Sequence, residues 1–207
     1  MSSNLVLMQG DRMKTSRATR ISLICAGRSA GVHTSTFGNL GLLPGEEVRI
    51  QQVFASICKI TTPILSAPEE NALQTASMIT ETFEVEEALA ELDHGRWKGA
   101  TLQAIAAAEP ENLQAWLTDP SIAPHGGETI VALLERARMW LGGRMERGGR
   151  HVVIANQSMV RALILGIIEA PAQSFWRLEV APLSTTEVSS DGQRWTIRTM
   201  GAVAGSG

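Results

Sequence analysis

The sequence has no excess of charge of one sign. It contains 18 lysine and arginine residues against 21 aspartate and glutamate residues, a formal net charge of −3 at pH 7. The two signs are interspersed along the chain. Because nucleic acids and anionic lipids attract clustered basic residues, we expect neither nucleic acid nor a membrane surface as a partner.

Long apolar runs are also missing. No stretch approaches the roughly 20 consecutive apolar residues that cross a bilayer. Near the start of the chain only residues 5–8 are continuously apolar, and basic residues follow them, so this segment lacks the apolar region of a secretory signal peptide. We interpret residues 1–19 as a flexible leader.

Cysteine is scarce, with Cys25 and Cys58 the two examples in 207 residues. Both lie in apolar stretches typical of buried strands or their ends, which suits reduced thiols better than a disulfide framework. A cytoplasmic location is therefore favoured. His94 and His125 lack the clustered spacing of metal ligands, so we assign no metal and expect no cofactor.

What the sequence does contain is an alternation of apolar strand patterns and amphipathic helix patterns. Strands are predicted at 21–25, 48–53, 57–61, 152–155, 186–190 and 194–200. Helices are predicted at 68–80, 102–108, 111–117, 129–147 and 158–169. Asp191-Gly192 predicts a hairpin turn. This alternation implies an α/β domain at 20–200 with a parallel or mixed sheet covered on both faces, and a disordered tail at 201–207.

Two segments in the first half of the chain carry a family resemblance. Residues 23–29 resemble the strand and loop that hold the Arg-His-Gly motif of the histidine phosphatase (phosphoglycerate mutase-like) superfamily, with Ala26 where the phosphoryl-accepting histidine is expected. Residues 66–76 are similar to the family's Ser-x-x-x-x-Arg-Ala-x-Gln-Thr-Ala helix start, with Asn71 where a phosphate-binding arginine is expected.

The second half of the chain continues the same ordered pattern. Residues 91–99 resemble the family segment that begins with a proton-donating glutamate, and Glu91 matches it. Residues 124–129 look like the Pro-x-Gly-Gly-Glu-Ser loop. Residues 152–162 are similar to the strand and helix start that bear the second catalytic histidine, with Asn156 at that position. The resemblance implies a three-layer α/β sandwich with a mostly parallel central sheet.

The departures from the family pattern all concern the phosphate chemistry. An alanine at position 26 offers no nucleophile. Cys25, Asn71 and Asn156 are neutral where the family places charged or basic groups, and each lost preorganised donor costs about 3–4 kcal/mol of transition-state stabilisation. A laboratory substitution would explain Ala26 but not Asn71 and Asn156, so natural divergence is favoured. Cys25 as a substitute nucleophile is the weaker interpretation, since it ends an apolar strand.

The residues that the resemblance places around the ancestral pocket are still polar. Their amides and charges favour a neutral polar ligand or a monoanion over a phosphate dianion. Glu91 is the candidate acid or base. The expected ligand-binding residues are Cys25, Ala26, Arg28, Asn71, His94, His125, Asn156 and Gln157.

Three functions fit these residues. The first is a catalytically degenerate member that binds a polar small molecule or a partner without histidine-dependent phosphoryl transfer. The second is a repurposed enzyme that uses Glu91 for other chemistry. The third is a phosphomonoesterase inactivated at its active site. The sequence leaves open whether the chain forms a homo-oligomer.

Overall fold

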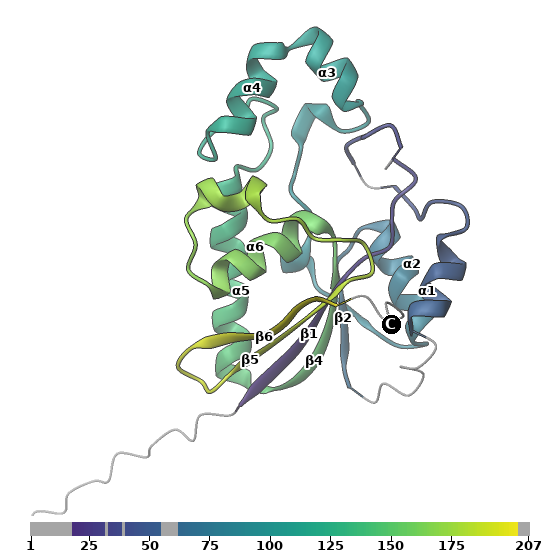
Figure 1. Cartoon of the computed structure of the whole chain (residues 1–207), viewed down its shortest axis with the longest axis vertical. Coiled ribbons are helices and arrows are strands. Elements are labelled where there is room, and N and C mark those ends of the chain that lie inside the picture. The colour runs from purple at the N-terminus through teal and green to yellow at the C-terminus, as the bar shows by residue number, and fades with distance from the viewer. Residues whose placement is uncertain (1–17, 32, 39, 55–61, 203–207) are drawn as a thin grey trace, which may run out of the picture.

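Strands of both directions form one sheet in the computed structural model, which describes residues 18–31, 33–38, 40–54 and 62–202 (Figure 1). The strands are β1 (Thr19–Cys25), β2 (Ile64–Ser66), β3 (Glu84–Val85), β4 (Gly149–Ala155), β5 (Thr185–Ser190) and β6 (Trp195–Ala202). Their order across the sheet is β3-β2-β4-β1-β5-β6. The pairs from β3 to β1 are parallel, whereas β5 runs antiparallel to β1 and β6. The sheet is therefore mixed, with the predicted hairpin at one edge.

Helices cover both faces of this sheet (Figure 1). One side carries α1 (Glu46–Phe54) and α2 (Glu70–Ile79), and the other carries α5 (Ile130–Arg147) and α6 (Gln157–Ile167). The expected α/β sandwich is confirmed. A separate pair, α3 (Leu102–Ala108) and α4 (Pro110–Thr118), extends beyond the carboxyl ends of the parallel strands. Within the described ranges, no helix combines the length and apolar character that a bilayer crossing requires.

Most helix predictions agree with the structure to within a few residues. The 102–108 prediction coincides with α3, and 129–147 differs from α5 by one residue. That residue, Thr129, is the N-cap, because its hydroxyl accepts a hydrogen bond from Ala132 N at 3.0 Å. β1 begins at Thr19 and β6 ends at Ala202, so these strands reach slightly beyond the predicted 20–200. The first two residues of the predicted disordered tail, 201 and 202, therefore belong to a strand.

The strand prediction at 48–53 is wrong, because this segment is helix α1. Its buried residues are Glu46, Ile50, Val53 and Phe54, a spacing of four, three and one that follows one helix face. Val48, the first residue of the predicted strand, lies off this face and is 56% exposed. The predicted strand at 57–61 lies outside the described residues.

β2 does not correspond to any of the predicted strands. This strand has only three residues, Ile64, Leu65 and Ser66, and all three are buried. A fully buried strand of this length shows no alternation of apolar and polar residues, so periodicity cannot identify it.

The register of β1 and β4 positions the residues that follow them. Ile24 lies beside Ile154 and Cys25 beside Ala155 in this parallel pair. Both strands are buried along this half of their length, which fixes the register because a slip would expose apolar side chains. The next residue of each strand therefore emerges at the same edge of the sheet.

Candidate functional site

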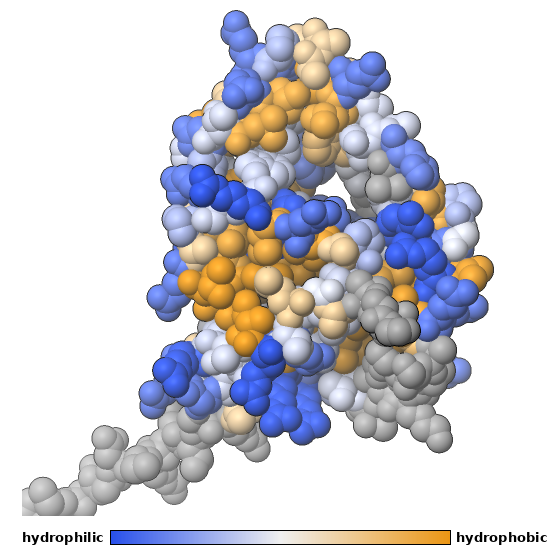
Figure 2. All heavy atoms as spheres, viewed as in Figure 1, coloured by the Kyte–Doolittle hydropathy of each residue, from blue (hydrophilic) through white to orange (hydrophobic). Residues whose placement is uncertain are grey.

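Three chain segments meet at the carboxyl ends of the parallel strands. The residue after β1 is Ala26, whose backbone N–H donates to the Ala155 carbonyl at 2.9 Å. The residue after β2 is Ala67, whose N–H donates to the Ile154 carbonyl at 2.8 Å. Asn156 follows β4. The space-filling view shows an opening between this edge and the part of the molecule that carries α3 and α4 (Figure 2). Ligand sites of open α/β sheets form at this edge.

Asn71 and Asn156 form a reciprocal amide pair at this edge. Asn71 Nδ2 donates to Asn156 Oδ1 at 2.7 Å, and Asn156 Nδ2 donates to Asn71 Oδ1 at 3.2 Å. Asn71 Nδ2 also donates to the Gly27 carbonyl at 3.0 Å, and Asn156 Nδ2 to Glu69 Oε2 at 3.5 Å. An amide carries two N–H donors, so every donor of the pair is used. What the two side chains still offer a ligand is the second acceptor position on each oxygen.

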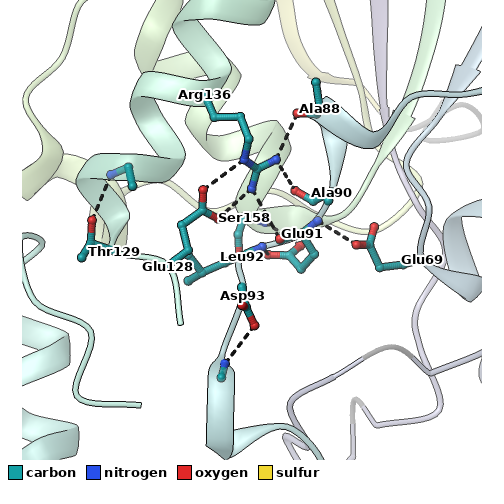
Figure 3. Close-up of polar contacts among 12 residues, drawn as sticks. Glu69, Ala88, Ala90, Glu91, Leu92, Asp93, Glu128, Thr129, Arg136 and Ser158 are labelled. Atoms are coloured by element: carbon teal, nitrogen blue, oxygen red, sulfur yellow. Dashed lines mark hydrogen bonds and ion pairs between the residues drawn. The ribbon is translucent and has the colours of Figure 1, made fainter. Parts of the chain in front are cut away.

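Glu91 is held by three backbone and side-chain contacts (Figure 3). Its carboxylate accepts hydrogen bonds from Leu92 N at 2.9 Å and Ser158 N at 3.2 Å. Its own N–H donates to Glu69 Oε1 at 2.8 Å. Burial raises the pKa of both Glu91 and Glu69, and the neighbouring Glu91 charge further raises the pKa of Glu69. The site thus contains two enclosed carboxyl groups.

Arg136 fixes the segment that carries Glu91 (Figure 3). Its guanidinium forms a fork on Glu128, with Nε donating to Oε1 at 3.0 Å and a terminal nitrogen to Oε2 at 2.7 Å. The other terminal nitrogen donates to the carbonyls of Ala88 at 3.0 Å and Ala90 at 2.8 Å. Sequence reasoning missed this role, because the partners come from separate segments and share no local spacing.

Two residues expected to bind ligand already have partners within the protein. Arg28 Nε donates to Glu46 Oε2 at 2.8 Å, and the Glu46 side chain is fully buried. The Arg28 guanidinium holds the pKa of Glu46 below its usual value, against the effect of burial. Gln157 Nε2 donates to the Val180 carbonyl at 2.8 Å. Arg28 is therefore paired with Glu46, a carboxylate that it shares with Arg49, whose terminal nitrogen lies 2.6 Å from Glu46 Oε1.

Arg161 is a second residue that sequence reasoning did not select. It lies on α6, three residues after Ser158, and so on the same helix face. Its Nε donates to the Leu178 carbonyl at 2.6 Å. Its Cζ lies 4.8 Å from the ring centre of Phe175 and 5.5 Å from that of Trp176. The described residues provide no hydrogen bond to its two terminal nitrogens.

Cys25 is buried at the end of β1 and forms no disulfide. Burial raises the pKa of its thiol, and the Glu91 charge raises it further. A thiol with a raised pKa is protonated at neutral pH and is a poor nucleophile. The structure thus supports the inert interpretation of Cys25. Cys58 lies outside the described residues.

His94 and His125 belong to an aromatic cluster between the 91–97 segment and α4. His94 packs on Phe37 with ring centres 4.4 Å apart. His125 is 5.0 Å from Trp97 by the same measure, and its Nδ1 accepts a hydrogen bond from Gly127 N at 3.1 Å. Both rings pack against aromatic side chains, and the described residues provide no hydrogen bond to the buried Nε2 of His125. In the described ranges, no group of three or more His, Cys, Asp or Glu side chains is placed to hold a metal ion.

Burial in this cluster predicts acid sensitivity. It lowers the pKa of His94 from 6.5 to about 4. The unfolded chain therefore binds more protons as the pH falls below 6.5, and the stability that neutral His94 contributes is lost between pH 6.5 and about 4. This shift corresponds to a loss of about 3 kcal/mol at most.

The test is the free energy of unfolding in urea, measured from pH 7 to pH 4 for wild type and for His94→Phe. The phenyl ring keeps the packing on Phe37 but cannot titrate. Wild type is expected to lose more stability than the variant over this range, and the difference removes the contributions of the other titrating groups. Parallel pH curves for the two proteins would contradict the buried neutral state of His94.

Comparisons with known proteins agree with this architecture. The family model described as histidine phosphatase superfamily (branch 1) matches residues 47–203, a range that begins after β1. A bifunctional protein of Mycobacterium tuberculosis is 30% identical over an alignment of 140 residues that covers 62% of this chain and 38% of that protein. Phosphoserine phosphatase 1 of Hydrogenobacter thermophilus is 25% identical over an alignment of 120 residues that covers 55% of this chain and 57% of that protein. The chain thus matches less than two thirds of the length of these relatives.

Solved structures show the same fold. A native mycobacterial glucosyl-3-phosphoglycerate phosphatase superposes with a TM-score of 0.75 at 25% identity, covering 90% of this chain and 100% of that one. Phosphoserine phosphatase of Entamoeba histolytica gives a TM-score of 0.78 at 18% identity, covering 89% and 98%. The mixed sheet and its flanking helices are therefore shared with phosphatases of known structure.

Proposed function

Because this chain belongs to the histidine phosphatase superfamily, we propose that it is a member that has lost both catalytic histidines, with Ala26 and Asn156 in their places. Its site binds a small polar molecule without histidine-dependent phosphoryl transfer. The observation that carries this proposal is the Asn71–Asn156 amide pair, whose four N–H donors are all used within the protein.

A phosphate group needs donors and positive charge, because its oxygens only accept hydrogen bonds. Apart from Arg161, the side chains described at the site present acceptors. We call this set the acceptor cluster: Oδ1 of Asn71 and Asn156 and the carboxyl groups of Glu69 and Glu91. Arg28 and Arg136, which lie nearby, are already bound to Glu46 and Glu128. The acceptor cluster suits a ligand that carries hydroxyl, amide or ammonium donors.

The proposal predicts that phosphate esters are neither hydrolysed nor bound. We expect no phosphate release from a broad panel of phosphomonoesters, and no change in melting temperature on adding orthovanadate, a phosphate analogue. The mycobacterial glucosyl-3-phosphoglycerate phosphatase, whose structure is known with VO3, serves as the positive control. Ester turnover that persists through purification and disappears in Glu91→Gln would overturn the proposal.

One observation favours a second candidate, a repurposed enzyme that uses Glu91 as acid or base. The raised pKa of this enclosed carboxyl group is the kind of shift that acid–base catalysis requires. Glu91→Gln keeps the size and one acceptor of the side chain but cannot exchange a proton. Lysate is incubated with wild type and with Glu91→Gln. If a product forms only with wild type, while the variant still binds the ligand, the chain is an enzyme and not solely a binding protein.

A further inference from the structure

Arg161 differs from the other two arginines described around the site in what its guanidinium contacts. Arg136 is bound by a carboxylate and by backbone carbonyls, and Arg28 by a buried carboxylate. Among the residues that the structure describes, no carboxylate lies within hydrogen-bond distance of Arg161, and its one hydrogen bond runs from Nε to the Leu178 carbonyl. Two terminal nitrogens with four N–H donors therefore stay available to a ligand.

Contacts that do not use the terminal N–H groups hold the Arg161 guanidinium in one orientation. Phe175 and Trp176 lie against it, and the short bond to Leu178 fixes its Nε edge. Stacking on aromatic rings orients the planar group and leaves its outer edge open. A preorganised guanidinium loses little side-chain entropy when an anion binds.

The position of Arg161 connects it to the site. It lies one helical turn beyond Ser158, whose N–H binds the Glu91 carboxylate. The Arg161 charge lowers the pKa of both Glu91 and Cys25, although burial outweighs it, which places the guanidinium within electrostatic reach of both groups. The site is therefore bipolar, with the Arg161 cation beside the acceptor cluster.

Resting on the proposed function, we infer that the ligand is a small hydroxy- or amino-carboxylic acid. Arg161 binds its carboxylate, and the hydroxyl or ammonium group donates to the acceptor cluster. A carboxylate is a planar monoanion that matches the fork of two guanidinium nitrogens. A phosphate dianion carries more negative charge toward Glu69 and Glu91 and offers no donors, so it fits this arrangement less well.

Two probes separate the two halves of this site. L-serine carries a carboxylate, a hydroxyl and an ammonium group, and ethanolamine is the same molecule without the carboxylate. Both are titrated into the whole chain while its amide NMR signals are recorded. We expect wild type to bind both, and Arg161→Gln to weaken L-serine binding by about tenfold or more while ethanolamine binding is unchanged.

Two further variants control this experiment. Arg138→Gln removes an arginine whose terminal nitrogen donates to the Ala170 carbonyl at 3.3 Å, and it is expected to bind L-serine like wild type. Arg161→Lys keeps the charge but loses the planar fork, so intermediate affinity is expected. Ethanolamine binding by each variant shows that its site is still folded.

The results distinguish the inference from the function on which it rests. If wild type does not bind L-serine, the inferred class of ligand is wrong. Equal L-serine affinity in wild type and Arg161→Gln, or a loss of both probes in Arg161→Gln, overturns the role of Arg161 as the carboxylate anchor. If wild type and Arg161→Gln bind L-serine equally and wild type also binds ethanolamine, the proposed function still holds. Binding of inorganic phosphate by wild type, with neither probe bound, overturns the proposed function itself.

Discussion

Gly127→Ala is expected to lower the melting temperature by roughly 6–12 °C, the equivalent of about 3 kcal/mol for a domain of this size. A Cβ atom at this position would lie 2.0 Å from the Asp93 carbonyl oxygen and 2.6 Å from Gly95 N. Both are backbone atoms, so no side-chain rotation relieves the overlap. The measurement is thermal unfolding followed by circular dichroism.

The reason lies in the crossing of two segments beneath α3 and α4. Glu128 N donates to the Asp93 carbonyl at 2.8 Å, and Arg96 N donates to the His125 carbonyl at 2.9 Å. These bonds hold the backbones so close that only hydrogen fits between them. An added methyl group separates them, and both bonds weaken.

Gly142→Ala is the matched control for this substitution. Gly142 lies inside α5, and a Cβ atom there would meet nothing within 4 Å. Alanine in a helix interior is more stable than glycine by about 0.5–1 kcal/mol, so this variant is expected to melt slightly higher than wild type. If Gly127→Ala melts at the wild-type temperature, the two segments do not cross as the structure describes.

Periodicity predicted the parts of the fold that are long or amphipathic. The strand at 152–155 with the helix after it, and the hairpin around Asp191-Gly192, are present in the structure. The failures have a common physical cause. In α1 a few apolar residues fit both a strand and a helix pattern, and in β2 burial on both faces removes the pattern altogether.

The site, like the fold, is only partly predictable from the sequence. Strand order and resemblance predicted that Ala26, Asn71, Glu91 and Asn156 lie together, since strand ends meet at one edge of an α/β sheet. The direction of their hydrogen bonds was not predictable. Asparagine both donates and accepts, and only the geometry of the pair reveals that its donors are used. The partner of Arg28 was also hidden, because Glu46 lies 18 residues away on a helix predicted as a strand.

Arg136→Gln is expected to destabilise the fold by about 2–4 kcal/mol and to release the segment that carries Glu91. The variant loses the fork on Glu128 and the bonds to the Ala88 and Ala90 carbonyls. The Arg136 side chain is 25% exposed and that of Glu128 17%, so water compensates only part of the loss. Glu128 is left as an enclosed carboxylate without its cation.

Two measurements separate the global effect from the local one. Urea unfolding gives the change in stability, and amide hydrogen exchange reports on Glu91 N, which donates to Glu69 in wild type. We expect faster exchange at Glu91 than the change in global stability explains, because the 88–91 backbone loses its anchor. Arg138→Gln, two residues further along α5, removes a single bond to the Ala170 carbonyl and is expected to change stability by less than about 0.5 kcal/mol.

Arg136→Lys distinguishes charge from geometry. Lysine keeps the positive charge beside Glu128 but cannot form the fork and reach the two carbonyls together. It is expected to recover part of the stability while exchange at Glu91 stays fast. If lysine restores slow exchange, the charge of residue 136 is sufficient to hold the segment. If the Glu91 amide exchanges as slowly in Arg136→Gln as in wild type, Glu91 is positioned by its own bonds to Leu92 and Ser158. The contacts of Arg136 then do not position Glu91.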